Sequence, residues 1–274
     1  MKLFLKRVSF WVLACAAGGL PAAARAQFSS DRPGYANSTQ TAPHLQPIVE
    51  MGTAFTFDED DGTSLSAPSA SIRLGLGTST ELRLALPNVT GVFPEEGDND
   101  VAFGDATAGL KVAFEVGRNG AMSFVPSVSI PVNGGDATGR LEWNWSYSPN
   151  AFGLMGNLAG GTVAPDLVLG EGSIAVTYAP SDPLWFYLLG VMLWVEDEDP
   201  DAFAGAGMGY MLNPALQVDF SFDVGLTEGT TRLTVSAGLT VLLGESAAAP
   251  ATAPVAPTAQ LRRPRPPGVG RAAP

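Results

Sequence analysis

The residue types that most often carry catalysis are scarce in this sequence. His44 is its single histidine, so a Ser-His hydrolase would have to use that side chain. No Gly-x-Ser-x-Gly elbow, zinc-ligand spacing or phosphate-binding glycine loop is present. Cys15, the one cysteine, lies in an apolar leader. We therefore expect a polar cap at His44, no catalytic, metal or cofactor site, and no enzymatic activity.

Charged side chains offer a different chemistry, because they could line a path for a solute. They recur at every second position of otherwise apolar stretches. In 216–226, Asp219 and Asp223 alternate with Phe220 and Phe222. A period of two is typical of a strand with one polar and one apolar face.

The strands that would position these charges are long. Most expected strands run ten to thirteen residues, whereas soluble strands average about five or six and a tilted membrane strand needs about nine to eleven. A soluble sandwich would turn its polar faces outward, and a membrane barrel would turn them inward. Strand length favours the barrel. The expected strands are 45–57, 65–76, 79–91, 101–116, 121–132, 140–147, 151–160, 167–178, 184–195, 201–211, 215–226 and 231–243.

The connections between these strands alternate in character. Short turns such as 77–78, 117–120 and 180–183 alternate with longer or more acidic loops such as 92–100 and 196–200. An up-and-down membrane barrel has this pattern, with short periplasmic turns and longer outer loops. We predict an all-β, transmembrane antiparallel up-and-down barrel of twelve strands over 45–244, with both ends of the chain in the periplasm.

Both ends of the chain differ from the barrel in composition. A basic start, an apolar stretch over 8–20 and an Ala-x-Ala site ending at Ala26 predict a signal peptide, 1–26, that is cleaved after Ala26. Retention of Cys15 as a lipidated N-terminus is the alternative. Residues 27–44 are expected to form a periplasmic N-terminal segment. Residues 245–274 are rich in Ala, Pro and Arg, which predicts a disordered periplasmic tail, with binding to a partner as the alternative.

The charge balance limits the partners. The chain has a formal net charge of −12, and removal of 1–26 would leave eleven basic residues against twenty-seven acidic ones. Nucleic acid is excluded as a partner, because phosphate binding needs clustered Lys and Arg. The expected outer loops are acidic, as loops in water often are, or they bridge to lipopolysaccharide through divalent cations. The expected partners are outer-membrane lipid, lipopolysaccharide and a small apolar solute.

The expected inner face allows two interpretations. Its charges either fill a narrow lumen as pairs, with Arg232 bonding to Asp219 or Asp223, or they line a conduit. Stretch 184–195 is apolar on both faces, and its even-numbered residues, including Leu188, are expected to face inward as an apolar patch. The aromatics Trp143, Trp145, Tyr147 and Trp185 suit an interfacial girdle. The candidate lumen residues are Glu50, Arg73, Arg83, Asp105, Lys111, Glu115, Asp219, Asp223, Arg232, Phe186, Met192 and Trp194.

Two short motifs resemble a known family. Ser30-Asp31-Arg32-Pro33-Gly34 near the expected mature N-terminus, and the stretch Phe103-Gly104-Asp105 with Gly109 and Lys111, resemble the outer-membrane β-barrel family of the MetA pathway of phenol degradation. The resemblance covers most of 30–243. It implies an outer-membrane barrel of a Gram-negative bacterium, a porin-like channel or transporter for small hydrophobic or aromatic solutes. A structural or adhesive barrel with a lumen plugged by side chains and by 28–43 is the alternative.

Overall fold

The structure is a computed structural model that describes residues 28–58, 62–164, 167–227 and 232–244. The expected signal peptide, its Cys15 alternative and the tail 245–274 lie outside the described residues, as do parts of three expected outer loops. All regular secondary structure in the described part of the chain is β-strand. No helix there is long and apolar enough to cross a membrane.

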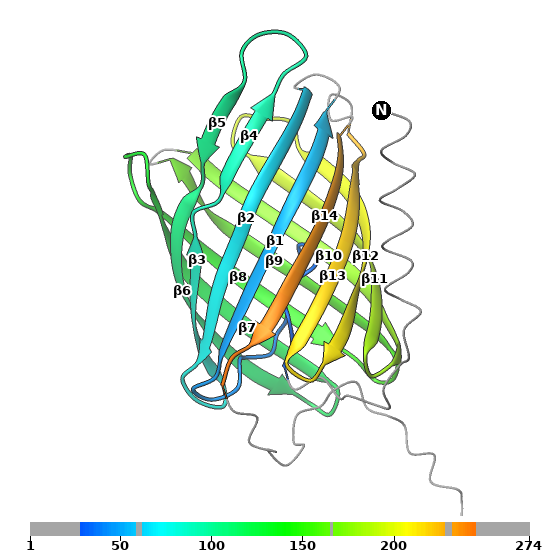
Figure 1. Ribbon diagram of the computed structural model, residues 1–274. Coiled ribbons are helices and arrows are strands. Elements are labelled where there is room, and N and C mark those ends of the chain that lie inside the picture. Colours follow the sequence, from blue (N-terminus) through cyan, green and yellow to red (C-terminus); the bar gives the residue numbers. More distant parts are fainter. Residues whose placement is uncertain (1–27, 59–61, 165–166, 228–231, 245–274) are drawn as a thin grey trace, which may run out of the picture.

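The strands form one closed antiparallel barrel of twelve wall strands, in which β1 pairs with both β2 and β14 (Figure 1). Fourteen strand segments make up this wall, because two of the twelve strands are interrupted. The segments are β1 (Pro47–Asp58), β2 (Gly62–Gly75), β3 (Thr80–Leu86), β4 (Val89–Phe93), β5 (Asp100–Phe103), β6 (Asp105–Val116), β7 (Gly120–Pro131), β8 (Thr138–Tyr147), β9 (Phe152–Ala164), β10 (Leu167–Ser181), β11 (Leu184–Val195), β12 (Asp201–Asn213), β13 (Leu216–Gly225) and β14 (Arg232–Leu242).

The two interruptions leave the strand register unchanged. Leu86 of β3 pairs with Ala70 of β2, and Val89 of β4 pairs with Ala67. The chain therefore advances by three residues on each strand between these two pairs, and no residue is inserted at the break. Pro87 lies at the break, where it has no N–H to donate to the ladder. Segments β3 and β4 are therefore one interrupted strand. By the same register β5 continues into β6, and the prediction of twelve strands is confirmed.

The connections distinguish the two ends of the barrel. Short turns join β2 to β3, β6 to β7, β8 to β9, β10 to β11 and β12 to β13, at the end where β1 begins and β14 finishes. Longer connections, including the one between β4 and β5, lie at the opposite end, where the β4–β5 hairpin extends beyond the rim (Figure 1). From the usual orientation of outer-membrane barrels, we expect the short turns to face the periplasm.

Apolar residues cover the outside of this barrel, and polar residues form much of its interior. On β13, Asp219, Ser221 and Asp223 are buried, whereas Phe220 and Phe222 are exposed on the outer surface. The most deeply buried side chains of the chain include Arg73 and Lys111. A soluble sandwich would have the opposite arrangement, so the burial pattern fits a barrel whose outer face contacts lipid.

Strand β11 turns the opposite face inward from the one expected. Leu188 is 65% exposed on the outside, and Phe186, Met192 and Trp194 are exposed there too. Leu189 is only 5% exposed and packs inside with Tyr187 and Val191. The expected inner patch of even-numbered residues is thus wrong. Because both faces of β11 are apolar, alternation could not show which face points inward. Pairing with β10 and β12 determines that orientation.

Candidate functional site

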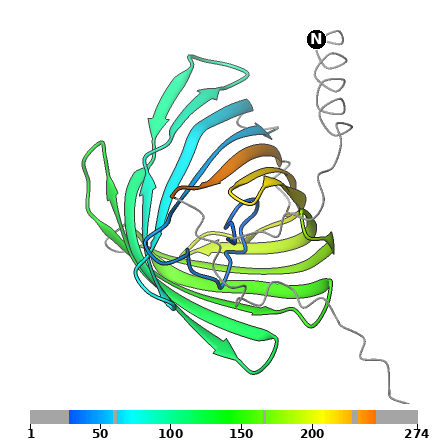
Figure 2. The same ribbon diagram turned by 60° about the horizontal axis from the view of Figure 1, so that its bottom comes forward.

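The N-terminal segment, residues 28–43, lies inside the barrel and not in the periplasm as expected (Figure 2). Hydrogen bonds hold it to several inner walls: Asn37 Nδ2 donates to Glu142 Oε1 at 2.8 Å, and the hydroxyl oxygens of Thr39 and Ser146 lie 2.8 Å apart. The backbone N–H of Ala42 donates to Glu81 Oε2 at 2.5 Å. Because this segment carries its own polar groups, it takes the place of water among the buried charges of the lumen.

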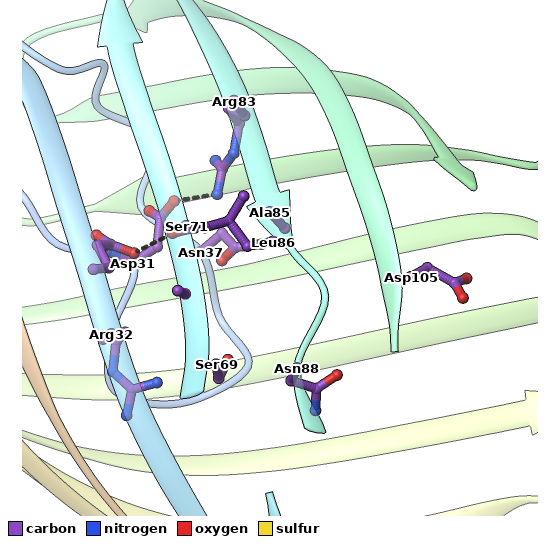
Figure 3. A pocket seen from close by; sticks show the side chains of 12 residues that line it. Asp31, Arg32, Asn37, Ser69, Ser71, Arg83, Ala85, Leu86, Asn88 and Asp105 are labelled. Atoms are coloured by element: carbon purple, nitrogen blue, oxygen red, sulfur yellow. Dashed lines mark hydrogen bonds and ion pairs between the residues drawn. The ribbon is translucent and has the colours of Figure 1, made fainter. Parts of the chain in front are cut away.

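Asp31 of the segment contacts three cations of the barrel wall. Its carboxylate lies 3.5 Å from Arg73 Nε and 3.6 Å from Lys111 Nζ. It also accepts a hydrogen bond from Arg83 Nη2 (Figure 3). Burial alone would raise the pKa of Asp31, but Arg73, Arg83 and Lys111 together lower it below its ordinary value. Asp31 therefore stays ionised in place, with its charge matched on β2, β3 and β6.

Two wall carboxylates complete this charged cluster. Glu81 accepts from Arg73 Nε and Nη2, both at 3.0 Å, and Glu50 accepts from Arg73 Nη1 at 3.1 Å. Arg73 also donates to the backbone carbonyls of Ser29 and Gln40, and Lys111 donates to that of Ser38 at 2.7 Å. The cluster thus binds the backbone of the segment as well as its carboxylate.

Arg32, the next residue, contacts the part of the wall on the other side of β1. Its Nη2 lies 3.3 Å from Asp219 Oδ1 on β13 and donates to the carbonyl of Ala237 at 3.3 Å. The segment therefore presents neighbouring charges of opposite sign to two parts of the wall that β1 separates: Asp31 to β2, β3 and β6, and Arg32 to β13 and β14. These contacts hold the segment against the wall on both sides of β1.

An apolar cluster covers the wall beside the segment. Ala175, Tyr187, Leu189, Val191 and Phe203 form it on β10, β11 and β12, and Trp185 and Leu193 pack against it. From the segment, Ala36 packs on this cluster and the Tyr35 ring lies 4.7 Å from that of Phe203. Trp185 faces inward here, so it is not part of an outer aromatic girdle. The interior of a water-filled porin is polar, so an apolar inner wall is a distinctive feature.

The segment borders two cavities of different character. One, of about 350 Å³, lies between the segment and β1, β2, β3 and β6, and its lining is mainly polar, including Ser69, Ser71, Asn88 and Asp105 (Figure 3). The other, of about 590 Å³, lies between the segment and the short-turn ends of β8–β13. Met155, Ala175, Trp185, Tyr187 and Leu189 give the second cavity an apolar wall.

The charged lumen candidates fall into three groups. Glu50, Arg73, Lys111, Asp219 and Asp223 are buried inside the barrel, and Arg83 and Asp105 line the polar cavity. Glu115 is exposed near the short-turn end of β6, and His44 is exposed at the same end, beside Gly75.

The pairing expected between Arg232 and Asp219 is wrong, because Asp219 forms its ion pair with Arg32. The Arg232 guanidinium lies 5.2 Å from the centre of the Phe203 ring and interacts electrostatically with Asp223, the other expected partner. Only pairs between wall strands were expected, but residues 28–43 supply a cation of their own, Arg32.

Sequence reasoning also missed an ion pair between two wall strands. Arg140 of β8 lies 2.7 Å from Glu171 of β10, and Asn157 of the intervening β9 donates to the same carboxylate at 3.0 Å. Glu171 lies between Gly170 and Gly172, so its strand showed little alternation in hydropathy. The signal that could have revealed Asp31 and Arg32 was present, because a charged pair precedes the first strand within the family-like motif.

Solved structures of outer-membrane channels and porins have a similar fold. The barrel is similar to the COG4313 outer membrane channel from Pseudomonas putida F1, with a TM-score of 0.57, 11% identity, and coverage of 77% of this chain and 99% of that one. For the NanC porin the TM-score is 0.52 at 8% identity, with coverage of 70% of this chain and 100% of the porin. For the CymD monoaromatic hydrocarbon channel it is 0.50 at 10% identity, covering 74% and 90%.

At these identities the structural matches show the fold alone. No curated protein sequence matches the chain. The family described as "Putative MetA-pathway of phenol degradation" matches residues 30–243, which include the whole barrel up to the last strand and the segment from Ser30 onward. The chain therefore belongs to that family, as an outer-membrane β-barrel with a channel-type fold.

Proposed function

We propose that this barrel is a gated passage for small apolar or aromatic solutes, and that residues 28–43 are its gate. The observation that carries the proposal is the apolar wall of Tyr187, Leu189 and Val191 inside the barrel, next to the segment. Ligand sites for small molecules are mostly apolar with a few polar groups, and their volumes are typically about 300–1,000 Å³. Tyr187 and Leu189 of this wall line the cavity of about 590 Å³, which falls within that range.

The comparisons support the same solute class. The family description refers to phenol degradation, and a protein of similar fold is named a monoaromatic hydrocarbon channel. The apolar wall gives this chain its own physical reason to prefer such solutes, because transfer of apolar surface from water to that wall is favourable.

The alternative of a structural barrel is supported by the same segment, because its ion pairs hold it inside the barrel. The two functions differ in whether the segment moves. A passage requires that the contacts of Asp31 and Arg32 break and form again, whereas a structural barrel requires only that they persist.

A matched pair of substitutions on β11 tests the passage. Leu189→Ala removes apolar surface from the inner wall, and Leu188→Ala makes the same change on the outer face one residue away. We expect Leu189→Ala to lower uptake of phenol by proteoliposomes by about tenfold, the scale for apolar discrimination in a pocket. Leu188→Ala should leave uptake near the wild-type rate. Equal uptake by both variants, or no uptake by wild-type barrels, would exclude the proposal.

A further inference from the structure

Arg32 lies in a recess of the barrel wall whose shape matches a guanidinium group. Gly52 of β1 and Gly238 of β14 are direct register partners, and Arg32 lies over both. A Cβ atom at Gly52 would lie 2.3 Å from Arg32 Cζ, and one at Gly238 would lie 2.2 Å from Arg32 Nε. Two facing glycines thus leave a flat space that any larger residue would fill.

Acceptors lie at the edge of this recess. Asp219 is the register partner of Gly238 on the next strand, so Gly52, Gly238 and Asp219 form one row across β1, β14 and β13. Asp219 Oδ1 and the carbonyl oxygen of Ala237 both lie 3.3 Å from Arg32 Nη2. The carboxylate of Asp219 has a side-chain exposure of 0%.

The recess also has unused bonding capacity. Asp219 Oδ2 and Arg32 Nε are both buried, and neither has a hydrogen-bond partner among the described residues. Arg32 therefore donates hydrogen bonds here from one nitrogen, Nη2, of its planar guanidinium group. A free guanidinium ion that can adjust its position could donate from more than one nitrogen. An ammonium ion is compact and strongly hydrated, and it cannot cover both glycines while reaching both acceptors.

We propose that the recess formed by Gly52, Gly238, Ala237 and Asp219 is a guanidinium-binding site. Arg32 occupies it from within the chain, and a free guanidinium compound occupies it once Arg32 is removed. When Arg32 leaves, Asp219 remains as a buried carboxylate without its cation, which is unfavourable. A planar cation from solution restores the missing charge and fills the space above the two glycines.

Direct binding of methylguanidinium to the folded barrel in detergent micelles tests this site. Saturation-transfer NMR on the full chain measures binding without reference to transport. We expect Arg32→Ala to bind methylguanidinium and wild type to show no binding at the same concentration, because its own arginine fills the recess. Arg32→Ala should bind methylammonium about tenfold more weakly.

Two second-site changes separate charge from shape. Arg32→Ala with Asp219→Asn should bind about tenfold more weakly than Arg32→Ala alone, the scale of a charge-assisted hydrogen bond. Arg32→Ala with Gly238→Ala keeps the carboxylate but fills the recess, and it should not bind. Arg32→Ala with Asp223→Asn is the matched control, an acid on the same face of β13, and it should bind as Arg32→Ala does.

Each variant is first shown to be folded by heat-modifiability on gels. Equal binding by wild type and Arg32→Ala would overturn the proposal, and so would equal binding of methylguanidinium and methylammonium. Retention of binding after Gly238→Ala would overturn it even if the Asp219 variant failed to fold. None of these outcomes depends on whether the barrel carries apolar solutes.

Discussion

Arg73 and Arg83 lie directly opposite each other on β2 and β3, on the inner face of the barrel. Like charges in this position repel. Asp31 contacts both guanidinium groups and is supplied by a segment that is not part of the wall. The charge balance of this wall is therefore complete only when the segment is in the lumen.

Neutralising Asp31 should release the segment. Asp31→Asn leaves Arg73, Arg83 and Lys111 with one fewer carboxylate, and breaking a buried ion pair costs about 3 kcal/mol or more. We expect higher conductance in planar bilayers and a lower temperature of heat-modification. Asp105→Asn is the control, since Asp105 lines the same polar cavity but is exposed. The same conductance in both variants would contradict the role of Asp31.

The lowered pKa of Asp31 predicts how acid affects the gate. A carboxyl whose pKa is lowered by its partners contributes its full binding energy at any pH above its ordinary pKa, which is 3.8 here. That energy is lost as the pH falls toward the lowered pKa. The segment should therefore stay in place from neutral pH down to about pH 4. Conductance measured across that range should stay constant in wild type. An opening transition centred near pH 6 would show that another group controls the segment.

The orientation of the barrel is testable with single cysteines in intact cells. Asp98 lies in the connection between β4 and β5, at the end assigned to the outside, and Asn119 lies in the short turn after β6. A membrane-impermeant maleimide should label Asp98→Cys and should not label Asn119→Cys until the outer membrane is permeabilised. Labelling of Asn119→Cys in intact cells would reverse the orientation.

Much of the fold could be predicted because alternation is visible in the sequence wherever one face is polar. On β13 the charges of Asp219 and Asp223 mark the inner face, and the structure places both inside. On β11 both faces are apolar, so nothing in that strand distinguishes Leu188 from Leu189. Its orientation depends on hydrogen bonding to β10 and β12, which is a property of the whole sheet.

The site could be predicted less well because it joins residues far apart in the chain. Asp219 and Arg32 are partners across 187 positions, and strand periodicity carries no information about such a contact. Gly52 and Gly238 look like ordinary small inward residues until Arg32 is placed over them. Strand alternation predicted that charges such as Asp219 face inward, whereas their pairing with residues 28–43 is visible only in the three-dimensional structure.

A reversible cross-link between the segment and the wall tests the gate most directly. The hydroxyl oxygens of Thr39 and Ser146 lie 2.8 Å apart, so Thr39→Cys with Ser146→Cys places two thiols within reach of a disulfide. Each single cysteine variant serves as a control. If the segment is the gate, oxidation of the double variant abolishes phenol uptake by proteoliposomes, reduction restores it, and the controls stay unchanged. Uptake at the wild-type rate through the oxidised, fully cross-linked barrel would contradict the account.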